Sequence, residues 1–318
     1  MKIVFMGTPE FAVPSLRLLH HAELIDVIAV ITQPDRPAGR GKKLQISPVK
    51  QYALENEIFY LQPSKIKNDK EVIDYLKNSN ADAFVTVAFG QILSKEILDI
   101  PPLGTINLHA SLLPEYRGPN PIQWAIINGD KKTGVTTMLT EEGIDCGDIL
   151  IKHEVPILLD YDSIKLTRDI SNIGARVLAD TVLGLCQGTI TPVKQDHSKA
   201  TKAPKLKKEK GNISWNDTTL NIHNIIRGTR PWPGSYTSFN GKIIKINKSF
   251  MPGISDDNKE FKPGSIINIT KTAIQVRTGD GYIELLELQP PNKPVMPAKD
   301  WARGARVKPG DMFIQTNE

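Results

Sequence analysis

Cysteine is scarce in this chain of 318 residues, which contains only Cys146 and Cys186. Two thiols are too few for a framework of disulfide bonds, and they do not show the paired spacing of metal ligands. The six histidines form no HExxH motif either, so we expect no catalytic metal. This pattern is typical of a protein in a reducing compartment, and it predicts a cytoplasmic location.

Long apolar runs are missing as well. No stretch reaches the about 18 apolar residues that a membrane-spanning helix requires. The N-terminal letters MKIVFMG predict a buried strand rather than a charged leader followed by an apolar core. The sequence therefore predicts a soluble protein that is not exported and has no membrane partner.

The glycine patterns that bind nucleotide phosphates are also absent. The first turn reads Gly7-Thr8-Pro9-Glu10, with one glycine in place of the GxGxxG of a dinucleotide site and a proline that removes a backbone donor. The segment GRGKK at 39–43 has neither the spacing nor the Ser or Thr of a P-loop. The first turn therefore argues against a rival hypothesis, that of an NAD-dependent oxidoreductase.

Charge is present, but it is unevenly distributed along the chain. Residues 1–198 carry 20 basic and 24 acidic side chains, residues 199–210 carry six Lys against one Glu, and residues 211–318 carry 14 basic and 10 acidic side chains. Lys and Arg that neutralise phosphates release condensed counterions, so two basic regions favour a polyanionic partner, with nucleic acid as the leading candidate. A Lys-rich solvated linker is the alternative interpretation of residues 199–210.

A further basic segment lies inside the acidic part of the chain. QPDRPAGRGKKLQISPVK, at 33–50, has five cations against Asp35. Its three prolines and two glycines disfavour a helix or an inner strand. We therefore predict a mobile surface loop from which the cations, Lys50 among them, project into solvent.

The first half of the sequence alternates short apolar runs with amphipathic ones. Near-continuous apolar strands separated by helical patterns predict a doubly wound, mostly parallel α/β sheet with helices on both faces, a Rossmann-like fold. A hairpin at 135–155 and a long helix near 163–187 are expected to follow. The alternating runs are 2–7, 13–24, 25–33, 69–80, 82–90 and 105–111.

The composition changes after the long helix. The stretch TITPVKQDHSKATKAPKLKKEKG lacks apolar periodicity and indicates a domain boundary. Beyond it, a short helical pattern and several short strands separated by Gly, Pro and Asp turns predict a small OB-like β-barrel. We therefore predict a catalytic domain at 1–189, a basic linker at 190–208 and a barrel at 209–318.

Two polar side chains interrupt the last apolar strand of the first half, in INLHASLLPEYRGPNP at 106–121. Alternation along a strand places Asn107 and His109 on one face. Burying each without a partner costs about 1–3 kcal/mol. A strand inside a sheet is therefore expected to carry them only if they have a role. Because Pro114 prevents a normal helical continuation, both should lie at the carboxyl end of the strand, where such sheets bind ligands. The alternative is that both simply bond to loop backbone.

A carboxylate in EEGIDCGD, Asp145, completes a set of three functional groups. An amide donor, an imidazole and a carboxylate can serve as oxyanion stabiliser, general base and orienting group when the substrate's own amine is the nucleophile. Ser111 lies outside any GxSxG motif, so covalent catalysis is not supported. A non-catalytic RNA-binding protein is the second rival, because it would not need these residues.

NLHASLLPEYRG together with GIDCGD resembles the signature of the folate-dependent formyltransferases, and the resemblance extends from MKIVFMGTPEFAVPSL through QPDRPAGRGKKL to RGTRPWPGSY. It implies transfer of a formyl group from 10-formyltetrahydrofolate to the α-amino group of methionine on initiator tRNA, by direct attack through a tetrahedral intermediate. A different acceptor amine, on a sugar nucleotide or on glycinamide ribonucleotide, is the alternative.

The resemblance also implies roles for individual residues. Asn107 would stabilise the oxyanion, His109 would relay the proton toward the folate nitrogen N10, and Asp145 would orient the imidazole and stabilise its cation. The position of Gln91 departs from the family pattern, so its role stays open. The expected folate-binding residues are Ser111, Leu112, Leu113 and Pro114, with the backbone around Phe89, Gly90 and Ile92.

The expected tRNA contacts lie in the two basic regions. Arg40, Lys42 and Lys43 would reach the acceptor end, and Lys205, Lys207 and Lys208 would contact the backbone. We expect a monomer.

Overall fold

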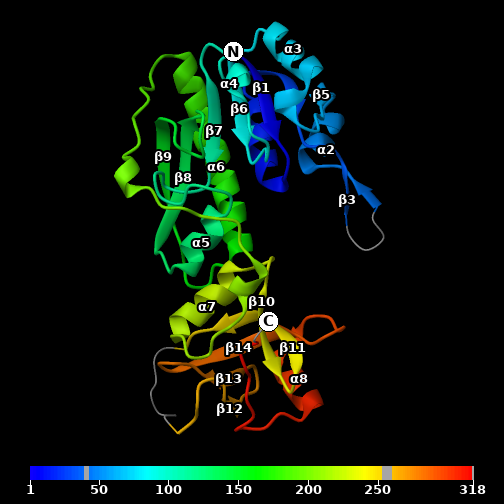
Figure 1. Ribbon diagram of the computed structural model, residues 1–318, viewed down its shortest axis with the longest axis vertical. Coiled ribbons are helices and arrows are strands. Elements are labelled where there is room, and N and C mark those ends of the chain that lie inside the picture. Colours follow the sequence, from blue (N-terminus) through cyan, green and yellow to red (C-terminus); the bar gives the residue numbers. More distant parts are fainter. Residues whose placement is uncertain (39–42, 253–259, 317–318) are drawn as a thin grey trace. The chain divides into compact units, whose positions relative to one another are not determined.

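The computed structural model describes residues 1–38, 43–252 and 260–316 (Figure 1). The chain divides into two compact units that interleave in sequence. The first consists of Met1–Pro119, Thr133–Pro156 and Thr167–Ala203, and the second of Asn120–Lys132, Ile157–Leu166 and Pro204–Glu318. The division at 189 and 208 that the composition predicts stays a prediction.

The first unit is built on a seven-stranded sheet in the order β5-β2-β1-β6-β7-β8-β9. The strands from β5 to β7 are parallel, and β8 is antiparallel to β7. The predicted mostly parallel α/β fold is therefore confirmed. The strands are β1 (Lys2–Gly7), β2 (Asp26–Ile31), β5 (Tyr60–Leu61), β6 (Ala83–Val87), β7 (Thr105–His109), β8 (Lys132–Leu139) and β9 (Ile149–Pro156).

Helices and 3-10 turns connect these strands. The long helix α6 (Ser163–Cys186) packs against the face of the sheet that carries Leu108, because a Cβ on Gly174 would lie 2.9 Å from a methyl carbon of Leu108. Asn107 and His109 alternate with Leu108 along β7 and therefore lie on the opposite face. The other elements are η1 (Glu10–Ala12), α1 (Val13–His20), α2 (Pro48–Glu55), η2 (Ile66–Asn68), α3 (Lys70–Asn78), α4 (Lys95–Leu98) and η3 (His197–Lys199).

The basic segment 33–50 differs from the predicted loop. Strands β3 (Arg36–Ala38) and β4 (Lys43–Gln45) form a separate antiparallel pair, and α2 begins at Pro48. The Ser47 hydroxyl caps this helix by accepting from the Lys50 backbone N–H, and proline at the first helical position has the φ that a helix needs. The prediction of a loop throughout 33–50 was wrong because Pro37 lies in an isolated edge ladder and Pro48 at a helix start, two places where proline is tolerated.

The second unit contains a six-stranded antiparallel sheet in the order β10-β11-β14-β13-β12, with β15 beside β14. Isolated bridges join Ile314 to Ser238 in β10, and Met312 to Ser265 next to β12. Because these bridges connect both ends of the sheet, the strands close into a small barrel, as predicted. They are β10 (Ser235–Phe239), β11 (Lys242–Phe250), β12 (Ile266–Ile269), β13 (Ile274–Arg277), β14 (Tyr282–Gln289) and β15 (Met296–Pro297).

Three helices and a 3-10 turn accompany the barrel: α5 (Pro121–Ile127), η4 (Lys208–Gly211), α7 (Thr219–Gly228) and α8 (Ala298–Ala305). Helices α5 and α7 approach closely at Gly228, where a Cβ would lie only 2.7 Å from Ile127. The barrel core includes Trp215, Phe239, Trp301 and Phe313. No helix of the described residues is both long and apolar enough to cross a membrane.

Candidate active site

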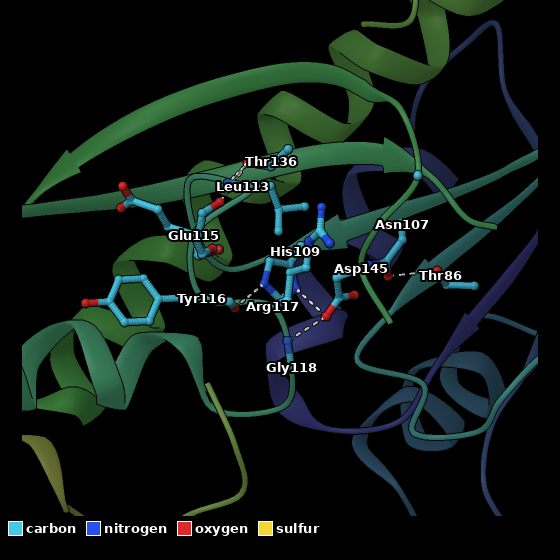
Figure 2. A network of polar contacts seen from close by, with 12 residues as sticks. Thr86, Asn107, His109, Leu113, Glu115, Tyr116, Arg117, Gly118, Thr136 and Asp145 are labelled. Atoms are coloured by element: carbon cyan, nitrogen blue, oxygen red, sulfur yellow. Dashed lines mark hydrogen bonds and ion pairs between the residues drawn. The ribbon is translucent and has the colours of Figure 1, made fainter. Parts of the chain in front are cut away.

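Strand β7 carries the first two polar side chains of the site (Figure 2). It lies between β6 and β8, so the backbone of Asn107 is fixed by neighbours on both sides. The Thr86 hydroxyl donates to Asn107 Oδ1 at 2.8 Å. The carbonyl end of the amide is therefore occupied, and among the described residues its NH2 group has no partner. An amide held in this way presents a hydrogen-bond donor to a ligand.

The side chain of His109 is only 7% exposed, and its two ring nitrogens face different groups. Nε2 lies 3.0 Å from the Tyr116 carbonyl oxygen, and Nδ1 lies 3.6 Å from Asp145 Oδ2. Because a carbonyl only accepts, Nε2 must carry the hydrogen in this arrangement. The neutral ring then has its lone pair on Nδ1, beside the carboxylate. Nδ1 is thus the basic atom, and its protonation creates an ion pair with Asp145.

Asp145 comes from the segment between β8 and β9, which folds over the polar face of β7 (Figure 2). Its Oδ2 accepts from the Gly118 backbone N–H at 2.8 Å. Its backbone carbonyl accepts from Gln195 Nε2 at 3.0 Å, and the same amide donates to the Gly147 carbonyl at 2.7 Å. Both the carboxylate and the backbone beneath it are therefore held by specific donors.

The expected folate residues after β7 differ in how their polar and apolar atoms are used. The Ser111 hydroxyl donates to the Glu115 carbonyl at 2.6 Å. Leu113 is fully buried beside Met138 and Ile149. The side chains of Ser111 and Leu113 are thus engaged inside the fold, whereas Leu112 and Pro114 are half-buried.

The expected folate residues after β6 lie in a braced loop. The Phe89 carbonyl accepts from Thr8 Oγ1 at 3.1 Å and from Gln33 Nε2 at 3.0 Å. A Cβ at Gly90, where φ is 78°, would lie 2.4 Å from Gln33 Nε2, so glycine lets that amide reach the loop. Ile92, in contrast, is 79% exposed.

Gln91, whose role the sequence left open, also braces this loop. Its Nε2 donates to the Pro63 carbonyl at 2.9 Å, and its Oε1 accepts from the Ile66 backbone N–H at 2.8 Å. Sequence reasoning missed both Gln33 and Gln195. A signal existed for Gln33 alone, because it stands just past the carboxyl end of β2, where ligand-binding side chains of such sheets gather.

The cations of the basic segment near 40 are only partly placed. Arg40 and Lys42 lie outside the described residues, and Lys43 is described only as a backbone position in β4. Lys50 does not project into solvent as predicted, because its ammonium lies 2.6 Å from Asp35 Oδ2 and 2.7 Å from Gln62 Oε1, with a side chain 12% exposed. That prediction was wrong because a nearby carboxylate and amide pair with this lysine.

The predicted linker cations are exposed. Lys205, Lys207 and Lys208 are all at the surface of the second unit. No cluster of three or more His, Cys, Asp or Glu side chains that could hold a metal occurs in the described part of the chain.

An amide donor, an imidazole and a carboxylate grouped on a mostly parallel sheet are the groups that an acyl-transfer site requires. Two family models match this chain: "Formyl transferase" over residues 1–182, and "Formyl transferase, C-terminal domain" over residues 205–306. The class is therefore that of the formyl transferases.

Relatives that match almost the whole chain narrow this class. The methionyl-tRNA formyltransferase of Clostridium acetobutylicum is 49% identical over 310 residues, which is 98% of each chain. That of Ruminiclostridium cellulolyticum is 46% identical over 311 residues, which is 98% of this chain and 99% of the relative. The chain belongs to the methionyl-tRNA formyltransferase family.

Solved structures share the fold at lower identity. The N-formyltransferase from Helicobacter canadensis, in complex with folinic acid and dTDP-3-aminofucose, is 21% identical with a TM-score of 0.65, covering 90% of this chain and 99% of that one. HypX from Aquifex aeolicus, in complex with tetrahydrofolic acid, is 16% identical with a TM-score of 0.62, covering 95% of this chain and 47% of that one. These likenesses show the fold alone.

Proposed function

We propose that this protein transfers the formyl group of 10-formyltetrahydrofolate to the α-amino group of methionine esterified to initiator tRNA. The observation that carries the proposal is the placement of His109 Nδ1, which is the basic atom of a buried ring and lies 3.6 Å from the Asp145 carboxylate. On the same face of β7, the amide NH2 of Asn107 has no hydrogen-bond partner in the described part of the chain. This grouping suits direct attack by an amine, with no covalent enzyme intermediate.

The residues divide the work as follows. Asn107 donates a hydrogen bond to the formyl oxygen as negative charge develops there. His109 Nδ1 accepts the proton that the amine loses as its nitrogen bonds to the formyl carbon. Asp145 stabilises the imidazolium ion. His109 then returns the proton to folate N10 as the bond between N10 and the formyl carbon breaks, so the donor leaves as tetrahydrofolate with a neutral N10–H.

The folate donor is proposed from two kinds of support. The Helicobacter and Aquifex proteins were solved with folate compounds. In this chain the loop after β6 presents the exposed side chain of Ile92 two residues after Gly90, which suits a flat ring. Because the side chains of Ser111 and Leu113 are engaged internally, we assign folate contact after β7 to Leu112, Pro114 and backbone atoms.

The tRNA acceptor is proposed from the distribution of cations and from the names of the relatives. The second unit has a surface groove of about 730 Å³ that includes Ala302 and Val307 in its lining. Five cations also line it: Lys271, Lys299, Arg303, Arg306 and Lys308. With the exposed Lys205, Lys207 and Lys208 of the same unit, these side chains suit a phosphate backbone.

A competition between acceptors tests the proposal. Wild-type protein is given a formyl-labelled folate donor with equal amounts of methionyl initiator tRNA, the same tRNA without methionine, an amino-sugar nucleotide and glycinamide ribonucleotide. We expect label on the methionyl-tRNA alone. Label on the sugar or on the ribonucleotide would establish the alternative acceptor, and no label anywhere would refute formyl transfer.

A further inference from the structure

Asp145 is held in a backbone conformation that needs support. Its φ of 51° lies in the left-handed region, which residues other than glycine rarely adopt. Its carboxylate nevertheless has to stay beside His109 Nδ1 for the proposed proton transfer. The groups that hold this backbone therefore decide where the carboxylate lies.

Gln195 holds the backbone of the Asp145 loop from inside the fold. The residue is 6% exposed, and its Nε2 donates to the carbonyls of Asp145 and Gly147 at 3.0 and 2.7 Å. Its Oε1 accepts from Arg117 Nε and Nη2 at 3.2 and 2.6 Å. Because a guanidinium only donates and carbonyls only accept, this amide can have only one orientation.

Arg117 stands between two residues that contact the proposed catalytic groups directly. The Tyr116 carbonyl accepts from His109 Nε2, and the Gly118 N–H donates to Asp145 Oδ2 (Figure 2). Tyr116 thus fixes the imidazole, and Gly118 fixes the carboxylate. Arg117, between them, holds the loop backbone through Gln195. The relative position of His109 and Asp145 is set from one short segment.

This short segment is itself fastened to the part of the chain that contains Gln195, residues 195–203. The Arg117 N–H donates to the Thr201 carbonyl at 2.9 Å, and the Ala203 N–H donates to the Arg117 carbonyl at 2.7 Å. The Tyr116 N–H donates to Thr201 Oγ1 at 2.8 Å. Segment 195–203 therefore holds Tyr116 and Arg117 by hydrogen bonds. Gln195, in the same segment, connects them to the backbone of the Asp145 loop.

We propose that Gln195 is a positioning residue for formyl transfer, which it serves by linking Arg117 to the backbone of Asp145. The inference rests on the proposed function. Among the described residues Gln195 makes no hydrogen bond to His109 or to the Asp145 carboxylate, and its bond to the Asp145 backbone is its most direct link to the site. Its main effect on the chemistry should therefore pass through the position of that carboxylate. A residue that only stabilises the fold has no such dependence.

A double-mutant cycle on kcat separates these two roles. Turnover and both KM values are measured for the wild type, Gln195→Leu, Asp145→Asn and the double variant. We expect Gln195→Leu to lower kcat about 10- to 100-fold, as small displacements of a reacting group do, with KM values within about twofold. In the Asp145→Asn background the same substitution should cost less than about twofold, because the carboxylate it positions is gone.

Gln187→Leu is the matched control, because this exposed glutamine follows α6 in the same unit. It should leave kcat unchanged. If Gln195→Leu costs the same factor with and without Asp145, or costs nothing, the positioning role is refuted while the proposed function stands. If the wild type transfers no formyl group to methionyl-tRNA, the proposed function fails and this inference fails with it.

Discussion

The two ring nitrogens of His109 have different neighbours and therefore different roles. Nε2–H is occupied by the Tyr116 carbonyl, so the ring cannot turn over without losing that bond. Nδ1 is left for proton transfer beside Asp145. A side chain that reproduces the first contact without the second would therefore separate structure from chemistry.

Glutamine at this position provides such a side chain. In His109→Gln the amide NH2 can donate to the Tyr116 carbonyl, but the amide cannot take up a proton at neutral pH. We expect kcat to fall about 10²- to 10⁴-fold, the usual loss for a general base. Thermal stability and folate affinity should stay close to wild type. Turnover within about threefold of wild type would contradict the assignment of Nδ1 as the base.

At the scale of elements, the segment from Tyr116 to Gly118 depends on a glycine. Gly118 has φ of 117°, and a Cβ there would lie 2.8 Å from the Ala203 carbonyl oxygen. Gly118→Ala should therefore displace the N–H that bonds to Asp145. We expect a loss of about 1–3 kcal/mol in the free energy of unfolding together with a lower kcat.

Gly188→Ala is the control for this substitution. Gly188 also has a positive φ, 67°, but its added Cβ would meet no described residue within 4 Å beyond its own stretch of chain. Gly188→Ala should lose about 1–2 kcal/mol, the cost of the left-handed backbone alone, and should keep its kcat. Equal losses of stability and equal kcat values in the two variants would show that close contact at Gly118 does not matter.

Asp35, the residue before β3, forms an ion pair with Lys50 of α2, and this pair holds the start of the β3–β4 ladder. Hydrogen bonds from Lys50 and then Gln62 lower the pKa of the Asp35 carboxyl below its usual value of 3.8. A carboxyl whose pKa is lower in the folded state stabilises the fold above its usual pKa, and that contribution is lost as the pH falls through the lower folded value. The substitution Asp35→Asn removes this contribution to stability.

We expect Asp35→Asn to lower the free energy of unfolding by about 1 kcal/mol at pH 7, as the loss of a typical hydrogen bond does. The difference from wild type should shrink below about pH 4 and vanish once the wild-type carboxyl is protonated. Denaturant unfolding from pH 7 to pH 2 measures this. Asp99→Asn, which removes an exposed pair with Lys95, should have little effect at any pH. A difference that is constant over this range would exclude the ion pair as the cause.

Most elements could be predicted because their apolar periodicity is local in sequence. Strands β1, β2, β6 and β7 and helices α1, α3 and α6 follow directly from such patterns. The position of Asn107 and His109 on one face of β7 follows from strand alternation. Lys50 and Gln195 could not be predicted, because their partners, Asp35 with Gln62 and Arg117 with Asp145, are brought to them by tertiary packing that no local pattern records.

At the scale of the whole molecule, two segments from the middle of the sequence, 120–132 and 157–166, group with the C-terminal residues. Their helical and apolar patterns give no indication of which core they join. In the second unit, α5 packs on α7 at Gly228, and Arg227 donates to the carbonyls of Leu158 and Tyr161. Burial lowers the pKa of the Arg227 guanidinium. Interleaving of this kind depends on contacts between distant segments and was not predicted.

The uneven distribution of charge gives the last prediction. If the groove of the second unit contacts tRNA phosphates, Lys271→Ala with Lys308→Ala should weaken tRNA binding and reduce the slope of log affinity against log salt by up to about one unit for each lost contact. The turnover of bound tRNA should not change, because neither lysine is among the residues that carry the chemistry. Filter binding between 50 and 300 mM salt, a range of about sixfold, resolves such a change in slope.

The matched control is Lys65→Ala with Lys67→Ala, which removes the same charge from exposed positions of the first unit. Long-range attraction depends on total charge and should weaken equally in both double variants. Local phosphate contacts should be lost only with Lys271 and Lys308. Equal slopes in the two variants would therefore show that the groove contributes net charge alone, and the tRNA contacts would have to be assigned elsewhere.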